Sequence, residues 1–226
     1  MIPIGSVLLD LDGTLVDSQP GIFASCVAAL RALGHEPDET LDIQRIIGPP
    51  LEDIMRMLLQ PYGDDRIDEA AAAYRQHYGE SGYLGSKSYP GIGGALAALQ
   101  QAGLRIYLAT SKRETFASRI LHHLGFAAYF DGIYGSVPGG ALDHKPELLA
   151  HIVSRHDIVL SRSVMVGDRR YDISGAHAVG MRGVGVLWGY GSRDELEMAG
   201  ADRLVESAAD LAPAVLSMVG GRQSES

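Results

Sequence analysis

Two aspartates, two positions apart, follow a short apolar segment near the start of the chain. The apolar run covers residues 4–9, and Asp10 and Asp12 come directly after it, with Gly13 and Thr14 close behind. Side chains alternate along a strand, but where a strand ends and the chain bends, carboxylates at i and i+2 converge on one spot. Two anionic groups held that close need a bound cation or a shared proton. The segment therefore predicts an acidic site at the end of a buried strand.

Three further groups of polar residues follow or open later elements. Thr110 and Ser111 end a predicted strand and offer hydroxyl and backbone N–H groups, which suits either a phosphate-oxygen site or an ordinary helix N-cap. Lys145 opens a predicted helix, where a cation opposes the macrodipole, so its side chain either points away or serves a bound anion. Asp168 and Asp172 follow another strand, on the opening turn of a helix. We expect all of them at one edge of the sheet, where parallel sheets bind ligands.

The elements that position these residues alternate between strands and helices. Short apolar runs, most of them next to a Gly or Asp, predict a parallel sheet covered by helices on both faces. The expected strands are residues 4–9, 104–109, 132–134, 164–166, 183–186 and, with a weaker signal, 203–205. The sequence therefore predicts an α/β protein with a Rossmann-like parallel sheet core.

The segment between the first two strands is too long for one crossover. Helix start and stop signals predict three helices in it, at residues 20–33, 50–59 and 67–78. We interpret residues 17–86 as an inserted all-helical cap domain, which leaves residues 1–16 and 87–219 as the α/β core. Residues 220–226 are small and polar, and we expect them to form a disordered tail.

Composition and charge restrict the class of protein. Of the 226 residues, 46% are hydrophobic, so the chain can bury a substantial core. A net charge of −9 argues against a nucleic-acid partner, because phosphate backbones are bound by positively charged surfaces. The single cysteine, Cys26, allows no disulfide framework, and no run approaches the roughly 18 apolar residues of a membrane span. We expect a cytoplasmic protein without membrane or nucleic-acid partners, as a monomer or homodimer.

The acid pair, hydroxyl, lysine and second acid pair resemble, in their order, the four motifs of the haloacid dehalogenase-like phosphohydrolases. The resemblance runs from Val7 to Val186, with the helical insert at the position of that family's C1-type cap. The resemblance is strongest to the phosphoglycolate phosphatase-like branch and to related phosphatases that accept nucleotides. It implies a Mg²⁺-dependent phosphatase that hydrolyses a small phosphate monoester, phosphoglycolate-like or a nucleotide monophosphate, through an aspartyl-phosphate. The implied partner is a small phosphorylated metabolite.

The resemblance also implies catalytic and phosphate-binding roles. Asp10 corresponds to the nucleophile and Asp12 to the general acid/base. Thr110 corresponds to the phosphate-binding hydroxyl, with Ser111 helping through its backbone, and Lys145 to the cation that neutralises phosphate charge.

The metal ligands implied by the resemblance are oxygen atoms. They are the Asp10 and Asp168 carboxylates and the backbone carbonyl of Asp12, with Asp172 supporting the metal. Hard oxygen ligands and a phosphate substrate indicate Mg²⁺ and not zinc. Without such a cation, four carboxylates and a phosphate dianion could not share one site.

Substrate choice is expected to depend on the cap. Gly48 and Pro49 belong to a stretch that resembles the loop laid over the substrate in relatives, and Arg45 could reach a second anionic group of the substrate. The chain departs from the family pattern at Lys112 and Arg169. Both departures bring positive charge near the phosphate site.

Two other functions are compatible with parts of the pattern. A sugar phosphomutase of the same superfamily uses the same core but returns the phosphoryl group to its substrate. An aspartate-phosphorylated signalling domain also combines acids, a hydroxyl and a lysine on a parallel sheet, although its phosphoacceptor does not lie on the first strand and it has no helical cap.

Overall fold

The chain divides into two compact units. The computed structural model describes residues 5–37, 51–137 and 139–220. One unit comprises Met1–Val16 with Ser88–Ser226, and the other comprises Asp17–Lys87. The chain passes from one unit to the other within the short strands β2 (Val16–Asp17) and β3 (Lys87–Ser88), which pair in a two-stranded sheet.

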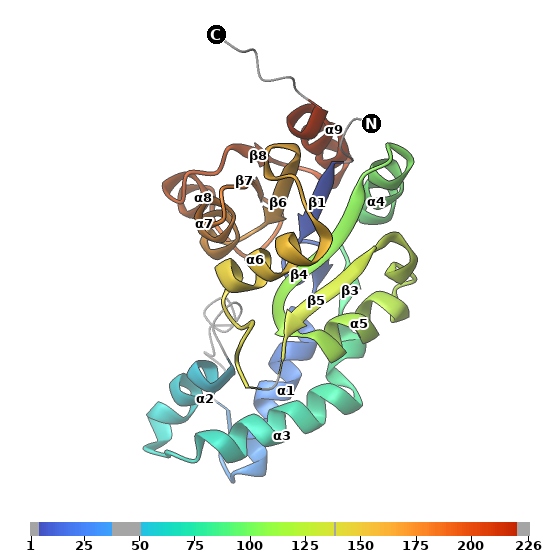
Figure 1. Ribbon diagram of the computed structural model, residues 1–226. Coiled ribbons are helices and arrows are strands. Elements are labelled where there is room, and N and C mark those ends of the chain that lie inside the picture. The colour runs from blue at the N-terminus through green and yellow to red at the C-terminus, as the bar shows by residue number, and fades with distance from the viewer. Residues whose placement is uncertain (1–4, 38–50, 138, 221–226) are drawn as a thin grey trace. The chain divides into compact units, whose positions relative to one another are not determined.

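A six-stranded sheet forms the centre of the first unit (Figure 1). The strand order is β5-β4-β1-β6-β7-β8, and every neighbouring pair is parallel. The strands are β1 (Ser6–Leu9), β4 (Arg105–Arg113), β5 (Gly132–Ser136), β6 (Ser163–Gly167), β7 (Arg182–Val186) and β8 (Arg203–Val205). The predicted Rossmann-like parallel sheet is confirmed, and the weakest predicted strand, at 203–205, has the predicted bounds.

Strand β4 extends further than the sequence indicates. The prediction that the strand ends at Ala109 is wrong, because extended backbone continues to Arg113 and α5 (Glu114–His123) follows at once. The pairing with β5 changes register between Ala109 and Arg113, so Thr110 and Ser111 lie in an irregular part of the strand. Burial continues to Thr110, one residue past the apolar run, whereas the extended backbone continues to Arg113. Arg113 holds the N-cap position of α5, so the N-cap interpretation of Thr110 and Ser111 is also wrong.

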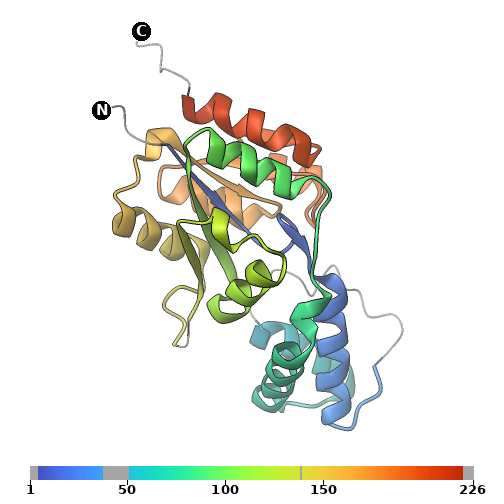
Figure 2. The same ribbon diagram turned by 90° about the vertical axis from the view of Figure 1, so that its right-hand side faces the viewer.

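Helices flank this sheet. Helices α4 (Ile92–Gln101) and α9 (Ala208–Gly220) pack side by side (Figure 2). Helices α6 (Lys145–His156) and α7 (Arg170–Ala178) pack on each other and on the sheet, and the short α8 (Arg193–Met198) follows β7. Gly220, the first residue of the predicted tail, ends α9, and residues 221–226 lie outside the described residues.

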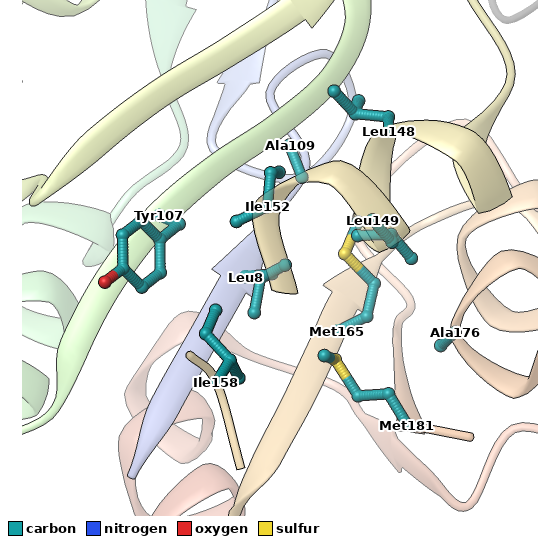
Figure 3. Packing of buried hydrophobic residues seen from close by; sticks show 10 residues of the cluster. All are labelled: Leu8, Tyr107, Ala109, Leu148, Leu149, Ile152, Ile158, Met165, Ala176 and Met181. Carbon is teal, nitrogen blue, oxygen red and sulfur yellow. The ribbon is translucent and has the colours of Figure 1, made fainter. Parts of the chain in front are cut away.

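The core beneath α6 fixes the central strands (Figure 3). Leu8 of β1, Tyr107 of β4 and Met165 of β6 pack with Leu149 and Ile152 of α6, and all five are at most 1% exposed. Full burial of such a side chain stabilises the fold by about 1.5–3 kcal/mol. Because side chains alternate, Val7 and Leu9 face the opposite side of the sheet, and all four residues of β1 are buried. The ends of β1, β4 and β6 are therefore held firmly beside one another.

The second unit is helical in its described residues. It contains α1 (Gln19–Ala32), α2 (Leu51–Leu59) and α3 (Ile67–Glu80), close to the predicted helix bounds, and α1 packs on α3. Cys26 of α1 is buried and unpaired. Short 3₁₀ turns in the two units cover Gln60–Tyr62, Gly82–Gly85, Ala127–Tyr129 and Leu160–Arg162. Among the residues that the structure describes, we find no helix with the length and apolarity to cross a bilayer.

Candidate active site

The carboxyl ends of β1, β4 and β6 bring most of the predicted site residues together. Leu9 is in register with Leu108 of β4 and Val166 of β6. The backbone N–H of Asp10 donates to the carbonyl of Val166 at 2.9 Å, which continues the β1–β6 pairing one residue past the strand. The residues that follow these strands therefore emerge at the same edge of the sheet.

Lys145 is the centre of this site. Its Nζ lies 2.9 Å from Asp10 Oδ1 and 2.7 Å from Asp172 Oδ1, and it donates to the carbonyl of Ala109 at 2.8 Å. Lys145 is only 5% exposed, so its ammonium group depends on these three oxygens in place of water. The lysine at the start of α6 thus points into the site. It cross-links Asp10 after β1, Ala109 within β4 and Asp172 in the helix after β6.

Burial and crowded carboxylates shift the acid–base equilibria. Burial, opposed by Lys145 and reinforced by the Asp172 and Asp12 carboxylates, raises the pKa of Asp10 to about 6. Burial, with the Asp172 and Asp10 carboxylates adding to it, raises the pKa of Asp168 to about 8. Although burial alone would lower the pKa of Lys145, the Asp10 and Asp172 carboxylates hold that pKa above its usual value. The site therefore carries more negative charge than one ammonium group compensates.

The donor set fits a hard divalent cation. Carboxylate oxygens of Asp10, Asp168 and Asp172 lie within 4.8 Å of one another, and all three residues are buried. Asp172 already binds Lys145 through Oδ1 and the backbone N–H of Arg169 through Oδ2, at 3.1 Å. Asp172 therefore also holds the Lys145 ammonium and the backbone at the start of α7 in place, which suits it to a supporting role at a metal. Oxygen donors and unbalanced negative charge favour Mg²⁺.

Asp12 has a cationic partner that the sequence did not reveal. Lys112 Nζ lies 2.7 Å from Asp12 Oδ2, and both side chains are mostly buried. The other oxygen, Asp12 Oδ1, is buried and accepts no hydrogen bond from the described residues. Sequence reasoning placed the Lys112 charge near the phosphate site, but the structure joins it to the carboxylate predicted as general acid/base.

The remaining predicted residues have different surroundings. Thr110 is buried and its hydroxyl accepts from the backbone N–H of Lys112 at 3.2 Å, whereas Ser111 is exposed. The guanidinium of Arg169 pairs with Glu195 at 2.9 Å. The predicted specificity residues Arg45, Gly48 and Pro49 lie outside the described residues.

Thr14 and the segment after β7 also belong to the site. The Thr14 hydroxyl donates to Asp168 Oδ1 at 3.3 Å, and the backbone N–H of Tyr190 donates to Asp168 Oδ2 at 2.8 Å. Gly13 has a positive φ of 84°, and a Cβ on it would overlap Asp168 Oδ2, so only glycine suits this turn. None of these contacts was predicted. The glycines at positions 13 and 189 were the available sequence signal for such close packing.

Comparison with known proteins gives a consistent family match. A family model described as haloacid dehalogenase-like hydrolase matches residues 7–186. A protein of Pseudomonas aeruginosa named 5'-nucleotidase is 37% identical over 209 residues, which cover 92% of this chain and 92% of that protein. A plasmid-encoded phosphoglycolate phosphatase of Cupriavidus necator is 32% identical over 96% of this chain and 94% of its own.

One solved structure that matches a similar share of this chain is named a kinase and not a phosphatase. The structure of the Mycobacterium tuberculosis protein tyrosine kinase A is 36% identical, with a TM-score of 0.79. The similarity covers 95% of this chain and 99% of the solved one. The two chains therefore share one fold over nearly their whole compared length.

Proposed function

The chain belongs to the haloacid dehalogenase-like hydrolase family and is a phosphatase of that family, and we propose that it hydrolyses a small phosphate monoester through an aspartyl-phosphate on Asp10. The observation that carries the proposal is the buried Lys145 ammonium between Asp10 and Asp172, with Asp168 beside them. This arrangement supplies a nucleophile, a fixed cation and ligands for a metal. Relatives named 5'-nucleotidase and phosphoglycolate phosphatase support a nucleotide monophosphate or phosphoglycolate-like substrate.

In the first half of the proposed reaction, an Asp10 carboxylate oxygen attacks phosphorus in line with the leaving oxygen. The P–O bond to the leaving group breaks, and Asp12 transfers a proton to the departing alkoxide. Lys145 neutralises charge on Asp10 and on the phosphoryl oxygens, and the Thr110 hydroxyl and nearby backbone N–H groups bind those oxygens. Mg²⁺, held by Asp10, Asp168 and the Asp12 carbonyl, would supply further charge neutralisation.

The second half of the reaction returns the enzyme to its starting state. Asp12, now a carboxylate, accepts a proton from a water molecule whose oxygen attacks phosphorus. The bond between phosphorus and Asp10 breaks, and inorganic phosphate leaves. One residue serves both steps because the proton donated in the first step is recovered in the second.

We also propose that residues 17–86 act as a cap that selects the substrate. The support is their insertion between β1 and β4, the position of the family's C1-type cap, and their separation as a compact helical unit. A lid that excludes water during phosphoryl transfer must admit water for the second step, which requires movement.

A panel of phosphate esters tests the proposed function. Purified protein, treated with EDTA and then supplied with Mg²⁺, is incubated with phosphoglycolate, nucleotide monophosphates and sugar phosphates while inorganic phosphate is measured. Multiple-turnover, Mg²⁺-dependent release of inorganic phosphate from at least one ester supports the proposal. Isomerisation without phosphate release, single-turnover labelling, or an undiminished rate after EDTA would each contradict it.

Tyrosine phosphorylation is the second candidate, because the solved tyrosine kinase A chain matches almost the whole of this one. The same preparation is therefore incubated with ATP and a tyrosine-containing peptide. Phosphotyrosine formation that D10N abolishes, without release of phosphate from any ester in the panel, would favour the kinase function over the phosphatase.

The contact between Lys112 and Asp12 predicts a dependence on the leaving group. Lys112→Ala should lower kcat/KM for an alkyl phosphate about tenfold or more, because its leaving oxygen needs a well-placed acid. Hydrolysis of p-nitrophenyl phosphate, whose leaving group departs without that help, should stay within about threefold. Steady-state kinetics on both esters measures the split. Lys87→Ala, at an exposed lysine, is the matched control.

An equal loss of kcat/KM on both esters would contradict the role of Lys112 in positioning Asp12 as the general acid. Lys112→Arg keeps the positive charge and should recover part of the loss on the alkyl phosphate. A merely structural lysine would show no such difference between the two leaving groups.

The raised pKa values predict pH-dependent magnesium binding. Metal-free Asp10 and Asp168 have pKa values of about 6 and about 8, and Mg²⁺ binds their ionised forms. Protons therefore compete with the metal below these pKa values, and affinity should rise about tenfold from pH 6 to pH 7. It should level off above pH 8. Isothermal titration calorimetry in two buffers of different ionisation enthalpy measures both the affinity and the released protons.

Magnesium affinity that stays constant from pH 6 to pH 8, without proton release, would contradict this prediction. Asp194→Asn removes an exposed carboxylate at the start of α8 and should leave the pH dependence unchanged.

A further inference from the structure

The segment Trp188–Gly191, here called the clamp segment, contacts the two turns that carry the acidic residues. It follows β7 and precedes α8. The indole N–H of Trp188 donates to the carbonyl of Thr14 at 3.0 Å. The backbone N–H of Tyr190 donates to Asp168 Oδ2 at 2.8 Å. One short segment thus binds the turn after β1 and the carboxylate after β6.

Close packing accounts for both glycines of the clamp segment. A Cβ on Gly189 would overlap the carbonyl oxygen of Gly13 and the side chain of Asp168. A Cβ on Gly191 would overlap the carbonyl oxygen of Asp168. Neither glycine is among the described residues with positive φ, so steric space and not backbone conformation requires glycine here. The backbone of the clamp segment lies directly against Asp168.

Both ends of the clamp segment are anchored. Leu187 donates its backbone N–H to Val205 of β8 at 3.0 Å. At the other end, Ser192 caps α8, and the Glu195 carboxylate of that helix accepts from Arg169 Nε and from the backbone N–H of Arg170, both at 2.9 Å. These contacts hold the segment between the sheet and the first residues of α7. Its position is therefore defined independently of a bound metal.

We propose that the clamp segment positions Asp168 and the Gly13–Thr14 turn for the metal, with Trp188, Tyr190 and Gly191 as positioning residues. This inference rests on the proposed magnesium-dependent function. Tyr190 occupies one side of Asp168 Oδ2, and the Thr14 hydroxyl contacts Oδ1, so the carboxylate is held from two directions. Trp188 in turn fixes the backbone that carries Thr14. Mutation of groups that orient metal ligands in this way typically lowers metal affinity or activity about 10–100-fold.

The test measures magnesium binding directly. W188F removes the indole N–H donor and keeps an aromatic ring, while G191A places a methyl group against the Asp168 backbone. Each should raise the Mg²⁺ dissociation constant about tenfold in titration calorimetry. G94A is the matched control, because a Cβ at this helical glycine meets no atom within 4 Å. It should bind Mg²⁺ as the wild type does.

The single tryptophan of the chain gives a second readout. Trp188 emission in the wild type and in G191A should change as Mg²⁺ is added, with the midpoint about tenfold higher in G191A. At saturating Mg²⁺, kcat of W188F should return to within about threefold of the wild type, because the loss lies in metal binding. A purely structural defect would not be recovered by metal.

The outcomes separate the two proposals. Wild-type protein that binds no Mg²⁺ would overturn the proposed magnesium dependence and the positioning role with it. Wild-type binding with unchanged binding by folded W188F would overturn only the positioning role. If circular dichroism shows that G191A does not fold, W188F decides the result alone.

Discussion

Asp10→Asn should reduce phosphate release by at least about a thousandfold. An amide is a poor nucleophile toward phosphorus, and nucleophile removal commonly costs several orders of magnitude. Lys145 Nζ, now 2.9 Å from Asp10 Oδ1, keeps its contacts with Asp172 and the Ala109 carbonyl in the variant. The variant should therefore fold. Steady-state phosphate release with the best ester of the panel measures the effect.

The structure also predicts that D10N is no less stable than the wild type in the absence of metal. Burial is the main reason that the pKa of Asp10 is raised, so the ionised carboxylate is unfavourable in the folded state. A neutral amide removes this unfavourable contribution to the free energy of folding. Mass spectrometry must exclude deamidation to aspartate. Residual activity above a tenth of the wild type in an intact sample would contradict the nucleophile assignment, while Asp194→Asn should retain full activity.

Much of the fold was predictable because buried parallel strands have a strong local signal. Each β strand of the main sheet contains a short apolar run, and even residues 203–205 were predicted with their true bounds. The error at β4 has a physical cause. Residues Thr110 to Arg113 remain extended beside β5 with irregular pairing, although they are no longer apolar. Hydrophobicity reports burial, and extended backbone outlasts burial at an active-site edge.

The convergence of site residues was predictable for a different reason. Parallel strands end at a common edge, so Asp10 and Asp168 were expected at the same edge of the sheet. They lie close together because β1 and β6 are neighbouring strands. For Lys145, helix electrostatics alone could not predict whether the side chain points away from the site or into it. The structure shows that the two carboxylates outweigh the unfavourable macrodipole at the start of α6.

Contacts that depend on backbone groups or on long side chains were not predictable. The bond from Tyr190 to Asp168 uses a main-chain N–H, which every residue type except proline offers. The pair between Lys112 and Asp12 joins residues 100 positions apart through a flexible side chain. Such pairings depend on tertiary structure. The division into core and cap, and the specificity role of Arg45, stay predictions.

Lys145→Met should separate catalysis from metal binding. The substitution keeps an unbranched stem and removes the ammonium that contacts Asp10 and Asp172. Loss of a fixed charge beside the developing transition state should lower kcat about a thousandfold. Mg²⁺ affinity should not fall, because Lys145 repels a cation that shares the same carboxylates. Phosphate release and titration calorimetry on the same preparation measure the two effects.

Asp168→Asn gives the opposite pattern and serves as the matched comparison. Lys145 pairs with Asp10 and Asp172, and the amide oxygen introduced by the substitution can still accept from the backbone N–H of Tyr190, so the variant should fold. It removes one negative charge from the metal ligands, which should weaken Mg²⁺ binding about tenfold or more. The site geometry indicates that Lys145 neutralises charge on the phosphoryl group. If K145M lost Mg²⁺ affinity as D168N does, that role would be contradicted, and Lys145 would instead organise the metal ligands.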